Sequence, residues 1–309
     1  MDGRDTWAEA DEQALRHNMQ VQRDTVGPGV KINVCIKMNA YGFGADWVAR
    51  IAAQEGIDGF AWCDADDAAQ VRGAGVDLPV LLYPGTHGAG LQVLAQHGFI
   101  NTAHDGLSLA ACLGSARPFY LELDCGLGRL GFPAQDPEAI LQAMGNNPAI
   151  CQLVGAYAHF DDQLDRVAVD RQGCLFQRCV DVLQGRFDRP LERTVGASRV
   201  LVTDARWALK ATNPSALRYG LHGALAGLTL HPVLVGVKGC VIAIRHIPRE
   251  SMSGYPVKTW SSGRVVALVP AGYSDGLPRV QPQGPALRRG HQVPVDWPRH
   301  ATPSTPCST

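Results

Sequence analysis

The stretch IKMNAYGFG, residues 36–44, places Lys37 at the end of an apolar, β-branched run and follows it with Tyr41 and two glycines. A strand that ends in VCIK would fix Lys37 at the carboxyl edge of a sheet. A desolvated lysine there can lose its charge, and a carbonyl cofactor can then condense with the amine as a Schiff base. A lysine stem lying along a strand end with its ammonium group in water would produce the same pattern. The stretch alone leaves both interpretations open.

Length and composition describe an ordinary globular enzyme. The chain has 309 residues, 46% of them hydrophobic and 18% charged, with 28 basic and 29 acidic side chains. This balance indicates neither a nucleic-acid nor a membrane partner, and no apolar run approaches the roughly 18 residues of a membrane span. The amino terminus lacks the apolar region of a signal peptide, so we expect a cytoplasmic protein. The nine cysteines include no C-x-x-C pair, which favours free thiols over disulfides or zinc ligands.

Short apolar runs alternate with amphipathic helical stretches, which is the pattern of repeated βα units. The predicted strands are residues 32–36, 59–63, 79–83, 99–103, 119–124, 153–158, 192–195 and 216–218. The predicted helices are residues 46–54, 64–74, 91–97, 107–113, 137–144, 171–183 and 201–210. Eight such units predict an α/β fold, a (β/α)8 TIM-type barrel over residues 1–226. An open doubly wound sheet is the alternative, but no G-x-G-x-x-G follows the first strand.

The pattern changes after residue 226. Apolar runs at 233–237, 240–244 and 265–269 have no helices between them, so we expect a smaller all-β domain over residues 227–280. Seven of the 20 prolines then lie from Pro278 to Pro306. Because proline breaks strands, residues 281–309 are predicted to form a divergent, disordered tail and to leave the β domain incomplete.

Residue types suited to catalysis follow the predicted strands, where a barrel collects its chemistry. The first, fifth, sixth and seventh strands are followed by Lys37, Arg129, His159 and Ser198, and Arg218 closes the eighth. Each has an ordinary explanation when taken singly, such as a surface ion pair, a core histidine or a helix N-cap. Five such residues at one end of the strands favour a common site.

Five collinear motifs resemble those of the alanine racemases. They are K-x-x-A-Y-G-x-G from Lys37, D-x-G-x-G-R-L-G-F from Asp124, the His-Phe pair at His159, Arg-x-Gly at Arg218, and G-Y-S-D-G at residues 272–276. That family uses pyridoxal phosphate and combines a (β/α)8 barrel with a β domain. The resemblance implies an isomerase that interconverts L-alanine and D-alanine, a cell-wall precursor. It also implies a homodimer with shared active sites, in which each β domain reaches over the partner's barrel.

The resemblance also implies roles for individual residues. Racemisation removes a proton from one face of the substrate and returns it to the other, so it needs two bases, which match Lys37 and Tyr255. Arg129 would lie beside the catalytic tyrosine, and Arg129 and Tyr273 would contact the substrate. Cofactor contacts are implied for Tyr41, Ser198, Gly220 and Leu221 at the phosphate, Arg218 at the pyridine nitrogen and His159 on the ring. No metal is expected.

Three features depart from the family pattern. Glu122 lies where many members carry a carbamylated lysine, and we expect its carboxylate to orient Arg129. Pro256 replaces a glycine usually found after the catalytic tyrosine. The resemblance fades past Arg279, which suggests a truncated or frameshifted product. A catalytically impaired relative that binds pyridoxal phosphate, or a racemase for another small amino acid such as serine, therefore remains an alternative.

Overall fold

The computed structural model describes residues 5–82, 98–220, 227–248, 252–253, 258–259, 263–272, 275, 277, 286–293 and 305–308. The chain divides into two compact units, Asp11–Val233 and the combination of Met1–Ala10 with Leu234–Thr309. The larger unit thus extends past residue 226, and the first ten residues belong with the C-terminal segment. Among the described residues, no helix has the length and apolar character needed to cross a membrane.

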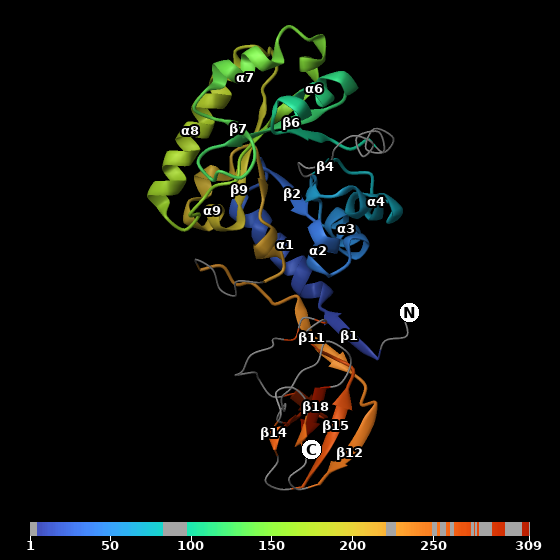
Figure 1. Ribbon diagram of the computed structural model, residues 1–309. Coiled ribbons are helices and arrows are strands. Elements are labelled where there is room, and N and C mark those ends of the chain that lie inside the picture. Colours follow the sequence, from blue (N-terminus) through green and yellow to red (C-terminus); the bar gives the residue numbers. More distant parts are fainter. Residues whose placement is uncertain are drawn as a thin grey trace. The chain divides into compact units, whose positions relative to one another are not determined.

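Eight parallel strands, of which Figure 1 labels β2, β4, β6 and β9, form a ring in the larger unit. They are β2 Lys31–Cys35, β3 Gly59–Cys63, β4 Val80–Leu82, β5 Asn101–Ala103, β6 Phe119–Asp124, β8 Leu153–Tyr157, β9 Glu192–Ala197 and β10 Ala211–Asn213. Their hydrogen-bonded order is β4-β3-β2-β10-β9-β8-β6-β5, and a parallel bridge between Leu81 and Ile100 joins its two ends. The short β7, Phe132–Pro133, pairs with β6 outside this ring. The predicted (β/α)8 barrel is confirmed.

Helices precede, connect and follow the strands of the barrel. They are α1 Glu12–Val26, α2 Lys37–Tyr41, α3 Ala45–Gln54, α4 Ala65–Gly73, α6 Gly106–Ser115, α7 Pro137–Met144, α8 Arg166–Gln184, α9 Ser198–Thr203 and α10 Ser215–Arg218, with 3-10 turns η1 Pro148–Gln152 and η2 Ala205–Ala208. Aspartates cap the amino ends of α1, α4, α6, α7 and α8, where their carboxylates accept first-turn amide protons. Each such cap stabilises its helix by about 1 kcal/mol.

Two predicted elements are wrong, and both lie near the end of the barrel. The eighth strand is β10, whereas residues 216–218 belong to the helical turn α10. The turn contains an apolar Ala-Leu pair, which led to the strand prediction. The true strand contains the polar residues Thr212 and Asn213, and the neighbouring strands of the ring bury both. The predicted helix 201–210 is interrupted at Asp204, whose extended backbone separates α9 from η2. The helix predicted at 91–97 lies outside the described residues.

The barrel is held by two clusters of buried apolar side chains, each formed between helices and strands. One cluster joins α6, α7 and α8 to β5, β6, β8 and β9, and includes Leu121 and Phe176. A second joins α1, α3 and α4 to β2, β3 and β4, and includes Leu15 and Val34. Burial of each large side chain stabilises the fold by about 1.5–3 kcal/mol. These contacts fix the strand ends from which the site is built.

The smaller unit is rich in strands among its described residues, as predicted. Its pairs are β1 Thr6–Ala10 with β11 Leu234–Gly239, β13 Met252–Ser253 with β14 Lys258–Thr259, and β16 Ala286–Arg288 with β17 His291–Val293. A three-stranded sheet contains β12 Ala243–Ile247, β15 Arg264–Val269 and β18 Thr305–Ser308.

The predicted disordered tail therefore contains strands at 286–288, 291–293 and 305–308. Arg289 and Gly290, both with positive φ, form the two-residue turn between β16 and β17. The turn accounts for the pairing of β16 with β17. The third strand, β18, contains Pro306 and lies at the edge of its sheet, where proline is tolerated.

Candidate active site

Lys37 begins α2 immediately beyond the carboxyl end of β2, and a left-handed turn follows it. The φ angle is 55° at Met38, 55° at Asn39, 53° at Ala40 and 59° at Tyr41. This conformation costs L-residues roughly 1–2 kcal/mol each, so the turn needs external support. Asp67 Oδ1 accepts a hydrogen bond from Asn39 N at 2.7 Å, and Asn39 Oδ1 accepts one from Ala45 N at 2.7 Å. Strain is therefore held in the four residues that directly follow Lys37, the residue predicted to be the Schiff-base lysine.

Tyr41 lies beside Lys37 at the barrel mouth. Lys37 Nζ is 5.6 Å from the centroid of the Tyr41 ring, and the Tyr41 Oη is 3.5 Å from Cys35 Sγ. The ring of Tyr219 lies 5.2 Å from that of Tyr41 and stacks on Phe43 at 4.9 Å. Burial raises the pKa of Tyr41, so its hydroxyl keeps its proton and can serve as a hydrogen-bond donor.

Arg218 is fully buried, and part of its guanidinium has no acceptor within the described part of the chain. Its Nη2 donates to Gln22 Oε1 at 3.0 Å. The Nε and Nη1 atoms have no hydrogen-bond partner among the described residues. Burial lowers the pKa of Arg218. Because buried charged donors without acceptors are costly, these two atoms indicate where a bound group would place an acceptor.

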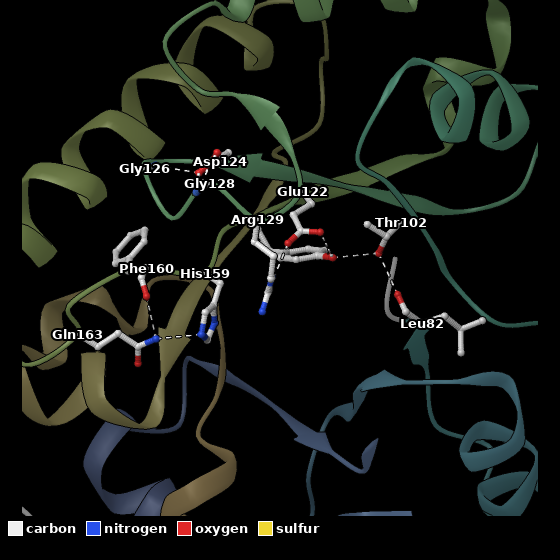
Figure 2. A network of polar contacts seen from close by, with 11 residues as sticks. Leu82, Thr102, Glu122, Asp124, Gly126, Gly128, Arg129, His159, Phe160 and Gln163 are labelled. Atoms are coloured by element: carbon white, nitrogen blue, oxygen red, sulfur yellow. Dashed lines mark hydrogen bonds and ion pairs between the residues drawn. The ribbon is translucent and has the colours of Figure 1, made fainter. Parts of the chain in front are cut away.

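Arg129, on the loop after β6, contacts a buried polar chain (Figure 2). Its Nη2 lies 3.5 Å from Oε1 of Glu122, and Tyr157 Oη lies 3.2 Å from Oε2 of the same carboxyl. Tyr157 Oη also lies 3.3 Å from Thr102 Oγ1, which donates to the Leu82 carbonyl at 2.9 Å. Burial raises the pKa of Glu122, while Arg129 and Tyr157 lower it. The contact needed for Glu122 to orient Arg129 is present, and that role stays a prediction.

His159 follows β8 and lines a cavity of about 390 Å³. Figure 2 shows its ring and the Arg129 side chain extending in the same direction from the sheet. Burial, followed by the positive charges of Arg129 and Lys37, lowers the pKa of His159 to about 4. Gln163 Nε2 lies 3.0 Å from His159 Nε2. The imidazole is therefore neutral at physiological pH.

Ser198 and Gly220 are predicted phosphate contacts. Ser198 is buried, lines the same cavity, and its Oγ accepts a hydrogen bond from Leu217 N at 3.3 Å. Gly220 has φ of 65°, and a Cβ there would overlap the His231 carbonyl. Its N–H donates to the Leu217 carbonyl at 3.2 Å. The backbone alone therefore requires glycine at position 220.

The structure brings most of the predicted site residues to the carboxyl ends of the barrel strands. These are Lys37, Tyr41, Arg129, His159, Ser198, Arg218 and Gly220. Leu221, Tyr255, Pro256 and Tyr273 lie outside the described residues. Among the described residues, no cluster of three histidine, cysteine or acidic side chains is suited to a metal ion.

Sequence reasoning missed several residues that support the site. Asp67 lies in an acidic run directly after the strand 59–63, so the rule that located Lys37 would also have pointed to it. Gln163 lies only four residues beyond His159. Gln22 lies on α1, far from Arg218 in sequence, and nothing in its surroundings signals their contact.

The residues present fit pyridoxal phosphate. Such a cofactor requires an amine for covalent attachment and hydrogen-bond donors for its polar atoms. The site offers the Lys37 amine, two Arg218 donors that have no acceptor among the described residues, and the Ser198 hydroxyl beside the cavity. The volume of about 390 Å³ is within the range of small-molecule sites.

Comparison with known proteins agrees with this geometry. The family model for the alanine racemase N-terminal domain matches residues 10–222. Alanine racemase of Sorangium cellulosum (strain So ce56) is 29% identical, over 94% of this chain and 81% of the relative. The structure of alanine racemase from Clostridium difficile 630 has a TM-score of 0.88 at 21% identity, covering 99% of this chain and 83% of that one. Alanine racemase from Bartonella henselae, solved with covalently bound pyridoxal phosphate, has a TM-score of 0.81 at 19% identity, covering 98% and 85%. The chain thus belongs to the alanine racemase family and is an isomerase of the amino-acid racemase class.

Proposed function

We propose that this chain interconverts L-alanine and D-alanine with pyridoxal phosphate linked to Lys37. The observation that carries the proposal is the pair of buried Arg218 donors that have no acceptor among the described residues, at the same barrel mouth as Lys37 and Tyr41. Relatives named alanine racemase support the substrate, and the Bartonella henselae structure supports the cofactor. We further propose a cytoplasmic enzyme that supplies D-alanine for cell-wall precursors.

Residues at the barrel mouth would hold the cofactor at both ends. Arg218 would donate from Nε or Nη1 to the ring nitrogen, and His159 would lie against the ring. Ser198 and the protonated hydroxyl of Tyr41 would bind the phosphate, together with Gly220 and Leu221. Because a guanidinium does not give up its proton, Arg218 would leave the ring nitrogen unprotonated.

The chemistry supplied by bound pyridoxal phosphate is an electron sink that acidifies the α-proton of the substrate. Lys37 Nζ would take or return that proton on one face. The hydroxyl of Tyr255 would do the same on the opposite face, since racemisation needs a base on each side. Arg129, oriented by Glu122, would contact the substrate carboxylate and favour the ionised form of Tyr255, with Tyr273 as a further substrate contact. We propose a homodimer in which Tyr255 acts at the partner's barrel.

Purified chain loaded with pyridoxal phosphate tests the proposal directly. We expect conversion of L-alanine to D-alanine, together with a pyridoxyl group on Lys37 after borohydride reduction and peptide mass mapping. Lys37→Ala should abolish both, and the exposed Lys210→Ala is the matched control that should change neither. L-Serine in the same assay decides the substrate.

The two readouts separate the outcomes. Cofactor attached to Lys37 without turnover of either amino acid would indicate a binding protein rather than a racemase. Folded protein without attachment would overturn the Lys37 assignment.

A further inference from the structure

The side-chain amide of Gln163 is bonded in a way that fixes its orientation. Its Nε2 lies 3.0 Å from His159 Nε2 and donates to the Phe160 carbonyl at 3.0 Å. Figure 2 shows Gln163 reaching both partners from one side. An amide turned the other way would place Oε1 against the Phe160 carbonyl, where two acceptors repel each other. The two protons of Nε2 are therefore directed to these two partners.

The backbone of Gln163 is held as well. Thr203 Oγ1 donates to the Gln163 carbonyl at 2.7 Å, which ties this loop to the end of α9. The side chain is thus presented to His159 from a fixed backbone position. Three hydrogen bonds therefore hold Gln163, two from its side-chain amide and one to its backbone carbonyl.

This orientation determines which ring nitrogen of His159 carries the proton. The amide Nε2 can only donate, so His159 Nε2 must accept, and the single proton of the neutral imidazole lies on Nδ1. A protonated Nε2 would point a hydrogen at the amide hydrogens of Gln163. Both the imidazolium and the other neutral tautomer are therefore disfavoured by the same contact.

The positive charges beside His159 act in the same direction. Lys37 and Arg129 lower its pKa, after the larger effect of burial. Arg199, Asp161 and Asp162 also line the cavity that His159 faces. An imidazolium at this position would be a further cation beside Lys37 and Arg129. The two aspartates would favour it, but burial and the two cations outweigh them, since the pKa of His159 is lowered.

We propose that Gln163 is a positioning residue that holds His159 as the neutral imidazole with its proton on Nδ1. The significance of this role rests on the proposed function, since His159 would lie against the cofactor ring. Gln163 then keeps an added positive charge away from the ring and from the amine of Lys37. It acts through His159 and needs no contact with the substrate.

Nitrogen NMR of ¹⁵N-histidine-labelled full-length chain, with pyridoxal phosphate present, tests the proposal. The chain contains ten histidines, and the His159 signals are assigned by their loss in His159→Gln. In the unmodified chain we expect a pyridine-type Nε2 and a pyrrole-type Nδ1 at every pH above about 5, one unit above the pKa of about 4. A protonated Nε2 in that range would overturn the proposal.

Two substitutions and a control complete the test. Gln163→Glu places an acceptor opposite Nε2, so the imidazolium should persist to a pH at least one unit higher, a tenfold change in its ionisation constant. Gln163→Leu removes the donor and should allow a proton on Nε2 of the neutral ring. The exposed Gln142→Glu adds the same charge on α7 and should leave His159 unchanged.

The outcomes distinguish this inference from the proposed function. A Gln163→Leu chain with the tautomer and pKa of the unmodified chain would overturn the role of Gln163, whatever the racemase activity. The expected spectra in a chain that converts neither alanine nor serine would leave the role of Gln163 standing and refute the racemase proposal. Gln163→Leu also provides the answer if Gln163→Glu fails to fold.

Discussion

Arg129 Nη2 lies 3.5 Å from Oε1 of Glu122, and the two side chains differ widely in exposure, at 43% and 2%. The buried Glu122 carboxyl on β6 therefore pairs with the exposed guanidinium of Arg129 at the barrel mouth. Burial raises the pKa of Glu122, and the charge of Arg129 opposes that rise. The balance between burial and the charge of Arg129 determines whether the Glu122 side chain is an ionised carboxylate or a neutral carboxyl.

Replacing Glu122 by glutamine tests this balance through the pH dependence of stability. A carboxyl whose pKa is raised in the folded state contributes stability that is complete below its unfolded pKa of about 4.3 and is lost as the pH rises through the folded value. Relative to the unmodified chain, Glu122→Gln should therefore gain stability as the pH rises across that interval. Urea unfolding midpoints from about pH 4 upward measure the difference. The exposed Glu138→Gln is the control, and a relative loss of stability in Glu122→Gln would show that Arg129 outweighs burial.

At a pH above the folded pKa of Glu122, the same substitution should also affect turnover, since Arg129 would lose a carboxylate partner. A partly exposed ion pair contributes about 1 kcal/mol at most, so we expect kcat/KM for alanine to fall up to roughly fivefold. Steady-state kinetics with both enantiomers measure this change. An unchanged kcat/KM in Glu122→Gln would mean that Arg129 is positioned without Glu122.

Asp67→Ala should loosen the turn that carries Lys37. Asp67 accepts the Asn39 amide proton, and its loss leaves a strained left-handed segment without that support. We expect a loss of about 0.5–1.5 kcal/mol in the free energy of unfolding, the contribution of a part-buried hydrogen bond, together with weaker pyridoxal phosphate binding. Denaturant unfolding and cofactor titration measure the two effects. Asp66→Ala on the exposed side of α4 should change neither, and a normal Asp67→Ala chain would mean that the turn supports itself.

The barrel was predictable because its strands are buried on both faces and therefore read as short apolar runs. Seven of its eight strands overlap the predicted ranges, and the exception is instructive. Thr212 and Asn213 are polar residues buried by their neighbours in the ring, so their strand lacks the apolar pattern. They are buried because β10 pairs with both β2 and β9 and so closes the sheet into a barrel. A short stretch of sequence carries no signal of that closure.

The site was predictable as far as its residues follow strands. Lys37, Arg129, His159 and Ser198 all do so, since each strand end delivers the next few residues to the barrel mouth. The hydrogen bonds that support them were not predictable. Gln22 reaches Arg218 from a helix almost two hundred residues away in the chain, and that contact depends on how α1 packs.

Arg218→Lys should reduce the stabilisation that the cofactor provides. Lysine keeps the charge but loses the planar set of donors, so Nε and Nη1 have no equivalent. At a concentration one hundred times its dissociation constant, a ligand stabilises the folded state by about 2.7 kcal/mol, and a tenfold weaker affinity removes about 1.4 kcal/mol of this. Thermal unfolding with and without pyridoxal phosphate measures the difference. An equal shift in both chains would mean that Arg218 does not contact the cofactor.

Gly173→Ala and Gly114→Ala form a matched pair in two helices. In an open helical position alanine is favoured over glycine by about 1 kcal/mol. Gly114 on α6 is such a position, because a Cβ there meets nothing within 4 Å, so Gly114→Ala should raise the free energy of unfolding. At Gly173 on α8 a Cβ would overlap the ring of Trp207, a buried side chain that donates to Asp170 at 3.0 Å. Overpacking of this kind costs about 1–3 kcal/mol, so Gly173→Ala should be destabilised despite its better helix propensity. Urea unfolding of both variants measures the contrast, and stabilisation of Gly173→Ala would show that Trp207 can move to make room.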